Sequence, residues 1–213
     1  QRGQFADMIQ RLAPPSAPWR TVDARADDLP AFGEIGGLVI TGSAASVTER
    51  APWMLGVEEY LRGAVDHGLP TLGICFGHQL LGQALGGQVA KNPAGREMGS
   101  VMYLEADADD VVSAPEARDY WCNMSHVDSV VELPPGAQVL GSTRLEPHAA
   151  LRFNERTWGV QFHPEFDDVT MRAYIEERRD ILLGEGIDPE QMLRDVRPGV
   201  AGSGVVLRFL ELL

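Results

Sequence analysis

The chain has 213 residues, of which 44% are hydrophobic and 23% charged, enough for one substantial core and therefore for a single domain over residues 1–213. Its formal net charge of −13 at pH 7 argues against a nucleic-acid partner, because a nucleic-acid surface needs Lys and Arg to neutralise phosphates. No apolar run reaches the roughly 18 residues of a membrane span and the first residues do not form a signal peptide, so no membrane contact is expected.

The first half of the chain reads as helices alternating with strands. Helices are predicted at 1–13, 57–68 and 78–87, and strands at 19–24, 38–42 and 70–75. This alternation indicates an α/β fold with a mostly parallel central sheet and helices on both faces. Because such folds normally start with a strand, we expect that an N-terminal strand is missing from the chain.

From about residue 88 the pattern changes to shorter strands separated by turn residues. Strands are predicted at 87–91, 100–106, 137–143, 149–153 and 157–162, and they read as hairpins that form a small antiparallel extension. Three helices are predicted in the tail, at 167–186, 188–196 and 204–213. Asp188 caps the second of these, with Pro189 at its first helical position.

The segment GICFGHQLL, residues 73–81, predicts a nucleophile elbow around Cys75. An apolar strand runs into a tight turn and then into a helix, and Gly73 and Gly77 remove the Cβ atoms that would block the turn. The start of the helix is positively polarised, which favours the thiolate form of the cysteine. We therefore interpret Cys75 as a nucleophile.

A base and its orienting partner follow in WGVQFHPEF, residues 158–166. A nucleophilic cysteine needs an imidazole to accept its proton, and the imidazole needs a group that fixes its tautomer. His163 and Glu165 supply these two groups, and Pro164 ends the strand that carries them. The pattern predicts a site in which Cys75 and His163 converge.

The remaining cysteine and histidines suggest no further chemistry. Two cysteines are too few for a disulfide framework, which predicts a reducing, cytoplasmic compartment, and Cys122 is interpreted as a packed residue. The five histidines lack the spacing typical of a zinc site, so no metal is predicted. His78, beside the nucleophile, is interpreted as a packing or hydrogen-bonding residue.

The chain resembles the class I glutamine amidotransferases in four segments that follow the family's order. They are GLVITGSAASV (37–47), GLPTLGICFGHQLLGQALGG (68–87), MSHVDSVVELPPG (124–136) and WGVQFHPEF (158–166). Within the family, the resemblance is to stand-alone proteins similar to the amidotransferase domain of GMP synthase, and it implies a flavodoxin-like α/β fold. It also implies that Cys75, His163 and Glu165 form a triad that hydrolyses the side-chain amide of glutamine through a γ-glutamyl thioester, without a cofactor.

The same resemblance implies further site residues. The oxyanion hole would be formed by the backbone N–H groups of Gly42 and Phe76. The substrate pocket would be formed by Ser43, Gln79 and the segment Ser125, His126, Val127 and Asp128. In similar proteins a glutamate at the position of Glu97 contacts substrate or packs behind the site, and the released ammonia passes to a synthetase. Here the synthetase would be a separate chain, or the protein would act alone.

Val127 departs from the family pattern SHGD, because it replaces the usual glycine. A β-branched residue restricts the backbone, so the shape of the pocket or the substrate preference could differ. Two alternatives to a glutaminase therefore stay open. One is a hydrolase of γ-glutamyl peptides or conjugates with the same triad, and the other is a non-catalytic binding or regulatory subunit.

Overall fold

The computed structural model describes residues 5–105, 110, 119–198 and 203–213. Its strands are β1 (Leu38–Ile40), β2 (Thr71–Ile74), β3 (Gln88–Lys91), β4 (Glu97–Glu105), β5 (Asp119–His126), β6 (Asp128–Glu132), β7 (Gln138–Ser142), β8 (Ala150–Asn154) and β9 (Thr157–Val160). Its helices are α1 (Phe5–Gln10), α2 (Pro52–Asp66), α3 (Phe76–Ala84), α4 (Asp168–Glu177), α5 (Arg179–Gly184), α6 (Pro189–Asp195) and α7 (Ser203–Leu210), with short 3-10 turns η1 (Phe32–Glu34) and η2 (Val47–Glu49).

The central sheet has seven strands in the order β1-β2-β9-β8-β7-β4-β5, and β3 pairs with β6 in a separate ribbon. β1, β2 and β9 run parallel, whereas β8, β7, β4 and β5 continue the sheet in antiparallel pairs. Every residue of β2 is buried, as expected for a parallel strand covered on both faces. The predicted α/β fold class is confirmed, and the antiparallel part is larger than the small extension expected.

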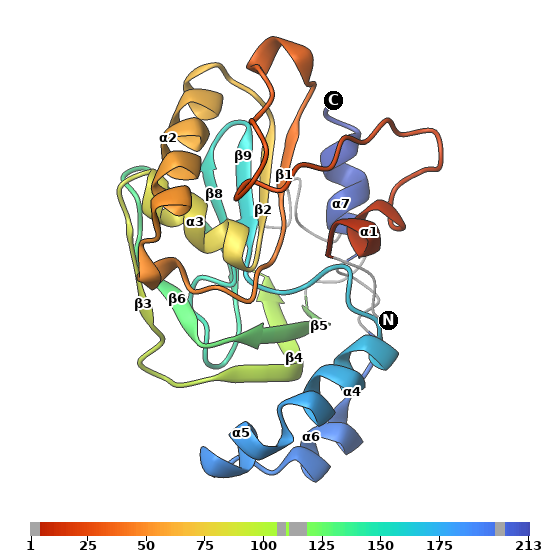
Figure 1. The fold of residues 1–213 in the computed structure, drawn as a ribbon. Coiled ribbons are helices and arrows are strands. Elements are labelled where there is room, and N and C mark those ends of the chain that lie inside the picture. Colours follow the sequence, from red (N-terminus) through yellow and green to blue (C-terminus); the bar gives the residue numbers. More distant parts are fainter. Residues whose placement is uncertain (1–4, 106–109, 111–118, 199–202) are drawn as a thin grey trace.

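Helices cover both faces of the sheet (Figure 1). α2 and α3 lie on one face, and α1 and α7 lie on the other. The apolar side of α3 packs with α2, and Leu80 and Leu61 are both fully buried there. On the opposite face Phe209 of α7 joins Leu72 and Ile74 of β2 in the core. Because β1 and β2 are parallel, their carboxyl ends meet at one edge of the sheet.

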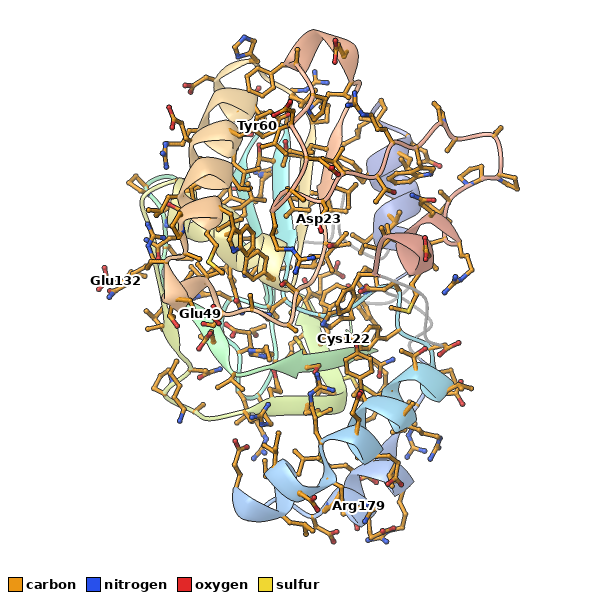
Figure 2. The ribbon with its side chains drawn as sticks, in the orientation of Figure 1. Asp23, Glu49, Tyr60, Cys122, Glu132 and Arg179 are labelled. Atoms are coloured by element: carbon orange, nitrogen blue, oxygen red, sulfur yellow. The ribbon has the colours of Figure 1, made fainter. Side chains whose placement is uncertain are left out.

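α4, α5 and α6 form a lobe at the bottom of Figure 1, next to the antiparallel part of the sheet. Met171 of α4 and Leu182 of α5 are buried there together with Met98 of β4. Arg179 belongs to this lobe (Figure 2) and pairs with Glu176 and Glu190 on its surface. These charged side chains form part of the solvated face of the lobe.

The C-terminal part of the chain differs from the prediction in the number of its helices. Residues 167–186 form two helices because Arg178, with φ −106° and ψ 12°, interrupts the helical backbone. The described tail therefore contains four helices, where three are predicted. The start of α6 agrees with the prediction, since the Asp188 side chain accepts from the Glu190 N–H and Pro189 is the first helical residue.

The strand predicted at 19–24 is wrong, because this segment forms no strand in the structure. The Asp23 carboxylate accepts hydrogen bonds from the backbone and side chain of Arg25, and the Asp23 N–H donates to Asp27. Such local bonds between side chain and backbone compete with a strand ladder and favour a turn.

Two strands have no counterpart in the prediction, β5 and β6. α2 also begins at Pro52, earlier than predicted, with the proline at its first position. Residues 1–4 of the predicted N-terminal helix and Ala106 of a predicted strand lie outside the described residues. Among the described helices, none combines the length and the apolar character needed to cross a membrane.

Candidate active site

Cys75 lies in the sharp turn between β2 and α3. Its backbone has φ 51° and ψ −102°, a combination that an L-residue adopts only under strain. A Cβ at Gly73 would come within 2.5 Å of the Gly77 carbonyl oxygen, and a Cβ at Gly77 would collide with the carbonyl oxygen of Ile40. The two glycines therefore permit the strand–turn–helix geometry of a nucleophile elbow, and Cys75 is 6% exposed at its tip.

The parallel pairing of β2 with β9 brings His163 beside the elbow. Ile74 and Val160 are register partners, and the Cys75 N–H donates to the Val160 carbonyl at 2.8 Å. On the other side, the His163 N–H donates to the carbonyl of Asn123 at 2.8 Å, which ties the segment after β9 to β5. Pairing within the sheet thus joins two residues that are far apart in the sequence.

The His163 imidazole is buried and bonded to Glu165. Its Nδ1 lies 2.8 Å from a Glu165 carboxylate oxygen, which leaves Nε2 for the sulfur of Cys75. Burial by itself lowers the pKa of His163, but the negative charges of Cys75 and Glu165 and hydrogen bonds to both raise it from 6.5 to about 10. The site therefore favours the imidazolium form, which is the partner that a thiolate needs.

Two aromatic rings pack against the imidazole of His163. Phe166 stacks on His163 with ring centroids 4.1 Å apart, and Phe5 of α1 stacks on the imidazole at 5.7 Å. The N-terminal helix thus contributes directly to the surroundings of the candidate base.

Gly42 lies just beyond the end of β1 and is buried against the same imidazole. A Cβ at Gly42 would lie 3.0 Å from His163 Cε1 and 3.4 Å from Phe5 Cε1, so a glycine lets the backbone approach the imidazole closely at this turn. Phe76 is the first residue of α3, and an N–H at this position has no acceptor within its own helix. The two sequence-predicted oxyanion donors thus flank the candidate nucleophile and base.

Gln79 lies on the elbow helix α3 and is bonded to the first residue of β6. Its Nε2 donates to the Asp128 carbonyl at 2.7 Å and to Gln161 Oε1 at 3.0 Å. The Asp128 carboxylate accepts from the Ser46 hydroxyl, so its side chain faces the loop after β1. The structure therefore brings Gln79 and Asp128 together, and Ser46 is a partner that the sequence does not indicate.

The other expected pocket residues occupy half-buried positions. Ser43 accepts the Ala45 N–H at 3.1 Å, and Ser125 lies on β5 near its end. Val127 has a negative φ, because the described non-glycine residues with positive φ are Arg50 and Cys75. Valine therefore replaces glycine here without forcing a left-handed backbone.

His126 and Glu97 lie in a buried polar network. His126 Nε2 is 3.3 Å from Glu97 Oε2, and its Nδ1 is 3.0 Å from the Asp128 carbonyl oxygen. The Thr143 hydroxyl donates to the Glu97 carboxylate at 2.7 Å, and Glu146 is buried nearby, 3.8 Å from His126 Nδ1. His126 and Glu97 are thus held by each other and by buried neighbours, and the two roles considered for Glu97 stay predictions.

Cys122 and His78 are enclosed by protein. Cys122 lies on β5 in the interior (Figure 2), and burial raises the pKa of its thiol far above the ordinary value. Burial likewise lowers the pKa of His78 from 6.5 to about 3, so its imidazole is neutral. Within the described residues, no group of three or more His, Cys, Asp and Glu side chains could hold a metal ion.

No role is predicted from the sequence for three side chains near the site: Gln161, Phe5 and Phe166. Gln161 follows β9 directly, and Nε2 of its amide lies 3.6 Å from Cys75 Sγ. Phe166 could be inferred from its position beside His163 and Glu165 in the sequence. Phe5 could not, because its stacking depends on where the chain carries α1.

An α/β sheet with a cysteine on an elbow and a histidine–glutamate pair just after the adjacent strand β9, which ends at Val160 rather than at the predicted residue 162, is the arrangement of a thiol-dependent site. The comparison with known families is more specific, since the model for "Glutamine amidotransferase class-I" matches residues 15–179. The chain belongs to the class I glutamine amidotransferases.

Curated relatives agree with this family. The chain is 34% identical over 218 residues to "GMP synthase [glutamine-hydrolyzing]" of Thermosipho africanus, covering 97% of this chain and 38% of that protein. The protein of the same name in Porphyromonas gingivalis is 36% identical over 178 residues, covering 83% and 33%. The chain thus spans less than two fifths of the length of these relatives.

Solved structures share the fold. A glutamine amido transferase from Methylobacillus flagellatus has a TM-score of 0.82 at 24% identity, covering 99% of this chain and 90% of that one. A glutamine amidotransferase from Thermotoga maritima has a TM-score of 0.74 at 23% identity, covering 89% of this chain and 83% of that one.

Proposed function

We propose that this chain hydrolyses the side-chain amide of glutamine through a γ-glutamyl thioester on Cys75. The observation that carries the proposal is the position of Cys75 beside an imidazole whose Nδ1 is 2.8 Å from Glu165. Family membership and the names of the relatives supply the substrate.

In the first half of the reaction, the Cys75 thiolate attacks the side-chain carbonyl carbon of glutamine and the C–S bond forms. The negative charge moves to the carbonyl oxygen, where the N–H groups of Gly42 and Phe76 stabilise it. The imidazolium of His163 then gives its proton to the amide nitrogen, the C–N bond breaks, and ammonia leaves.

In the second half, neutral His163 takes a proton from water while the oxygen attacks the thioester. The C–S bond breaks, glutamate leaves, and the thiolate and imidazolium are restored. Glu165 holds the imidazole in one tautomer and stabilises its charged form in both halves.

The direct test is a Cys75→Ala variant, which should release no ammonia from glutamine above background. A Cys75→Ala protein that hydrolyses glutamine at the wild-type rate would exclude the proposal. A glutamine analogue with an electrophilic carbon should label Cys75 in the wild type. Absence of labelling, together with absence of hydrolysis, would favour the non-catalytic alternative.

Substrate choice needs a separate assay, because a γ-glutamyl peptide forms the same thioester. Glutamine and γ-glutamyl peptides should be compared at equal concentration, with ammonia and glutamate measured together. Preference for glutamine supports a glutaminase, and preference for peptides replaces it with a γ-glutamyl hydrolase of the same mechanism.

The proposal includes a separate synthetase chain as the acceptor of ammonia and a cytoplasmic location. The names of the curated relatives combine GMP synthesis with glutamine hydrolysis, which supports a synthetase as the acceptor. Both cysteines are free, as in a reducing compartment, which supports the cytoplasmic location. Coupled assays with and without a candidate synthetase would measure stimulation of glutamine hydrolysis.

A further inference from the structure

Gln161 occupies a position at the candidate nucleophile that the proposed mechanism leaves unused. It directly follows β9, two residues before His163, and its side chain is fully buried. Its Nε2 lies 3.6 Å from Cys75 Sγ, and its Oε1 accepts from Gln79 Nε2 at 3.0 Å. The amide therefore bridges the sulfur and the elbow helix.

The direction of this amide is fixed by its neighbours. The backbone carbonyl of Asp128 can only accept, so Gln79 must turn its NH₂ group toward it. The same NH₂ group then faces Gln161, which must present its oxygen there. As a result, the NH₂ group of Gln161 faces the sulfur of Cys75 and can only donate to it.

We propose that Gln161 is a further catalytic residue, whose side-chain amide donates a hydrogen bond to the Cys75 thiolate. The inference rests on the proposed function, since it concerns the same thiolate. Gln79 acts as a positioning residue for this donor, in addition to the substrate contact that the family resemblance implies for it.

The thiolate is the nucleophile of the first half of the reaction and the leaving group of the second. A donor at the sulfur stabilises the thiolate when it forms and when it leaves, and the side-chain amide of Gln161 is already bonded to Gln79 and Cys75. Loss of the donor should therefore lower kcat with little change in KM. It should also shift the formation of thiolate to higher pH.

The test is alkylation of Cys75 by iodoacetamide as a function of pH, in wild type and in Gln161→Met. Methionine keeps the length of the side chain and removes the donor. We expect alkylation at neutral pH to slow by about 10- to 150-fold, the scale of one hydrogen bond to a charged group, and its midpoint to move to higher pH. Gln161→Glu should slow it further, because a carboxylate faces the thiolate.

Gln83→Met is the matched control. Gln83 lies on α3, as Gln79 does, and it also bonds to backbone groups. Its bonds to Gly87 and Val89, however, lie at the end of α3 that is remote from the elbow. This variant should keep the wild-type alkylation curve and kcat. Gln79→Met should shift the alkylation curve in the same direction as Gln161→Met, although no substrate is present in that assay.

Unfolding curves of every variant separate a local effect from loss of the fold. A folded Gln161→Met protein with the wild-type alkylation curve and kcat would overturn the inference, as would an equal shift in Gln83→Met. If the wild type itself neither alkylates at Cys75 nor hydrolyses glutamine, the proposed function fails instead. If Gln161→Met does not fold, Gln79→Met with the wild-type alkylation curve would overturn the inference.

Discussion

The imidazole of His163 lies almost parallel to the ring of Phe166, with the ring planes inclined by 14°. Phe5 is stacked on both, and its ring centroid lies 6.2 Å from that of Phe166. Phe166 therefore covers one face of the imidazole, and Phe5 lies beside this pair of rings rather than on the opposite face. In the plane of the imidazole, Nδ1 is bonded to Glu165, which leaves Nε2 for the sulfur.

Phe166→Leu should impair both stability and turnover. Replacement of the ring removes the stacking contact, which costs about 1–3 kcal/mol in the free energy of unfolding, and it lets the imidazole tilt. Urea unfolding and the kcat for glutamine hydrolysis measure the two effects. Phe209→Leu, at a fully buried ring of α7, is the control, because it should lose stability without a matching loss of kcat. Equal kcat values in the two variants would contradict the expectation.

The elbow glycines should not tolerate a methyl group. Gly73→Ala and Gly77→Ala would each force a Cβ against backbone atoms that cannot move aside, at a cost of about 1–3 kcal/mol or more. Gly56→Ala is the matched substitution in an open, exposed position of α2 and should stabilise the protein by about 0.5–1 kcal/mol. Thermal unfolding of the three variants tests this contrast, and it fails if Gly73→Ala or Gly77→Ala is as stable as wild type.

The charge pair at His163 should stabilise the fold most at lower pH. Its pKa is raised from 6.5 to about 10, so the folded state holds a proton that the unfolded state releases between these values. The contribution is complete below pH 6.5 and is lost as the pH rises through about 10. Urea unfolding of wild type and His163→Gln at pH 6 and pH 9.5 should show the larger difference at pH 6. A difference that grows with pH would contradict this sign.

His78 should act in the opposite direction, as an acid-sensitive group. Burial lowers its pKa from 6.5 to about 3, so the unfolded state binds a proton that the folded state does not. Stability should therefore fall as the pH decreases from 6.5, by up to about 1.4 kcal/mol per pH unit from this group. A folded His78→Gln variant should lose less stability than wild type between pH 6 and pH 4. Parallel curves would exclude His78 as the cause.

Local sequence signals predict the parts of the site that depend on local structure. The buried run before Cys75 and the flanking glycines determine the elbow, and the apolar alternation before His163 determines β9. The parallel pairing of β9 is not predicted, because residues 157–162 read as part of the antiparallel extension. In the structure β9 also pairs in parallel with β2, and the carboxyl ends of these two strands meet at one edge.

Other parts of the fold could not be predicted from local sequence signals. Residues 19–24 include strand-forming residues, but the carboxylates of Asp23 and Asp27 bind nearby backbone groups and form a turn. β5 does carry an alternating signal in its sequence, with Tyr120, Cys122 and Met124 buried along one face. The bond from Gln161 to Cys75 depends on side-chain geometry in the assembled fold, which no spacing rule supplies.

Gly77 rests directly on the backbone of Ile40, two residues before Gly42. Because this contact joins main chain to main chain, the separation between the elbow and the glycine turn does not depend on which apolar side chains fill the interior. Substitutions of apolar side chains in the interior should therefore leave the distance between the elbow and the Gly42 turn unchanged. A substitution of Gly77 itself should change this distance, because a Cβ there would collide with the backbone of Ile40.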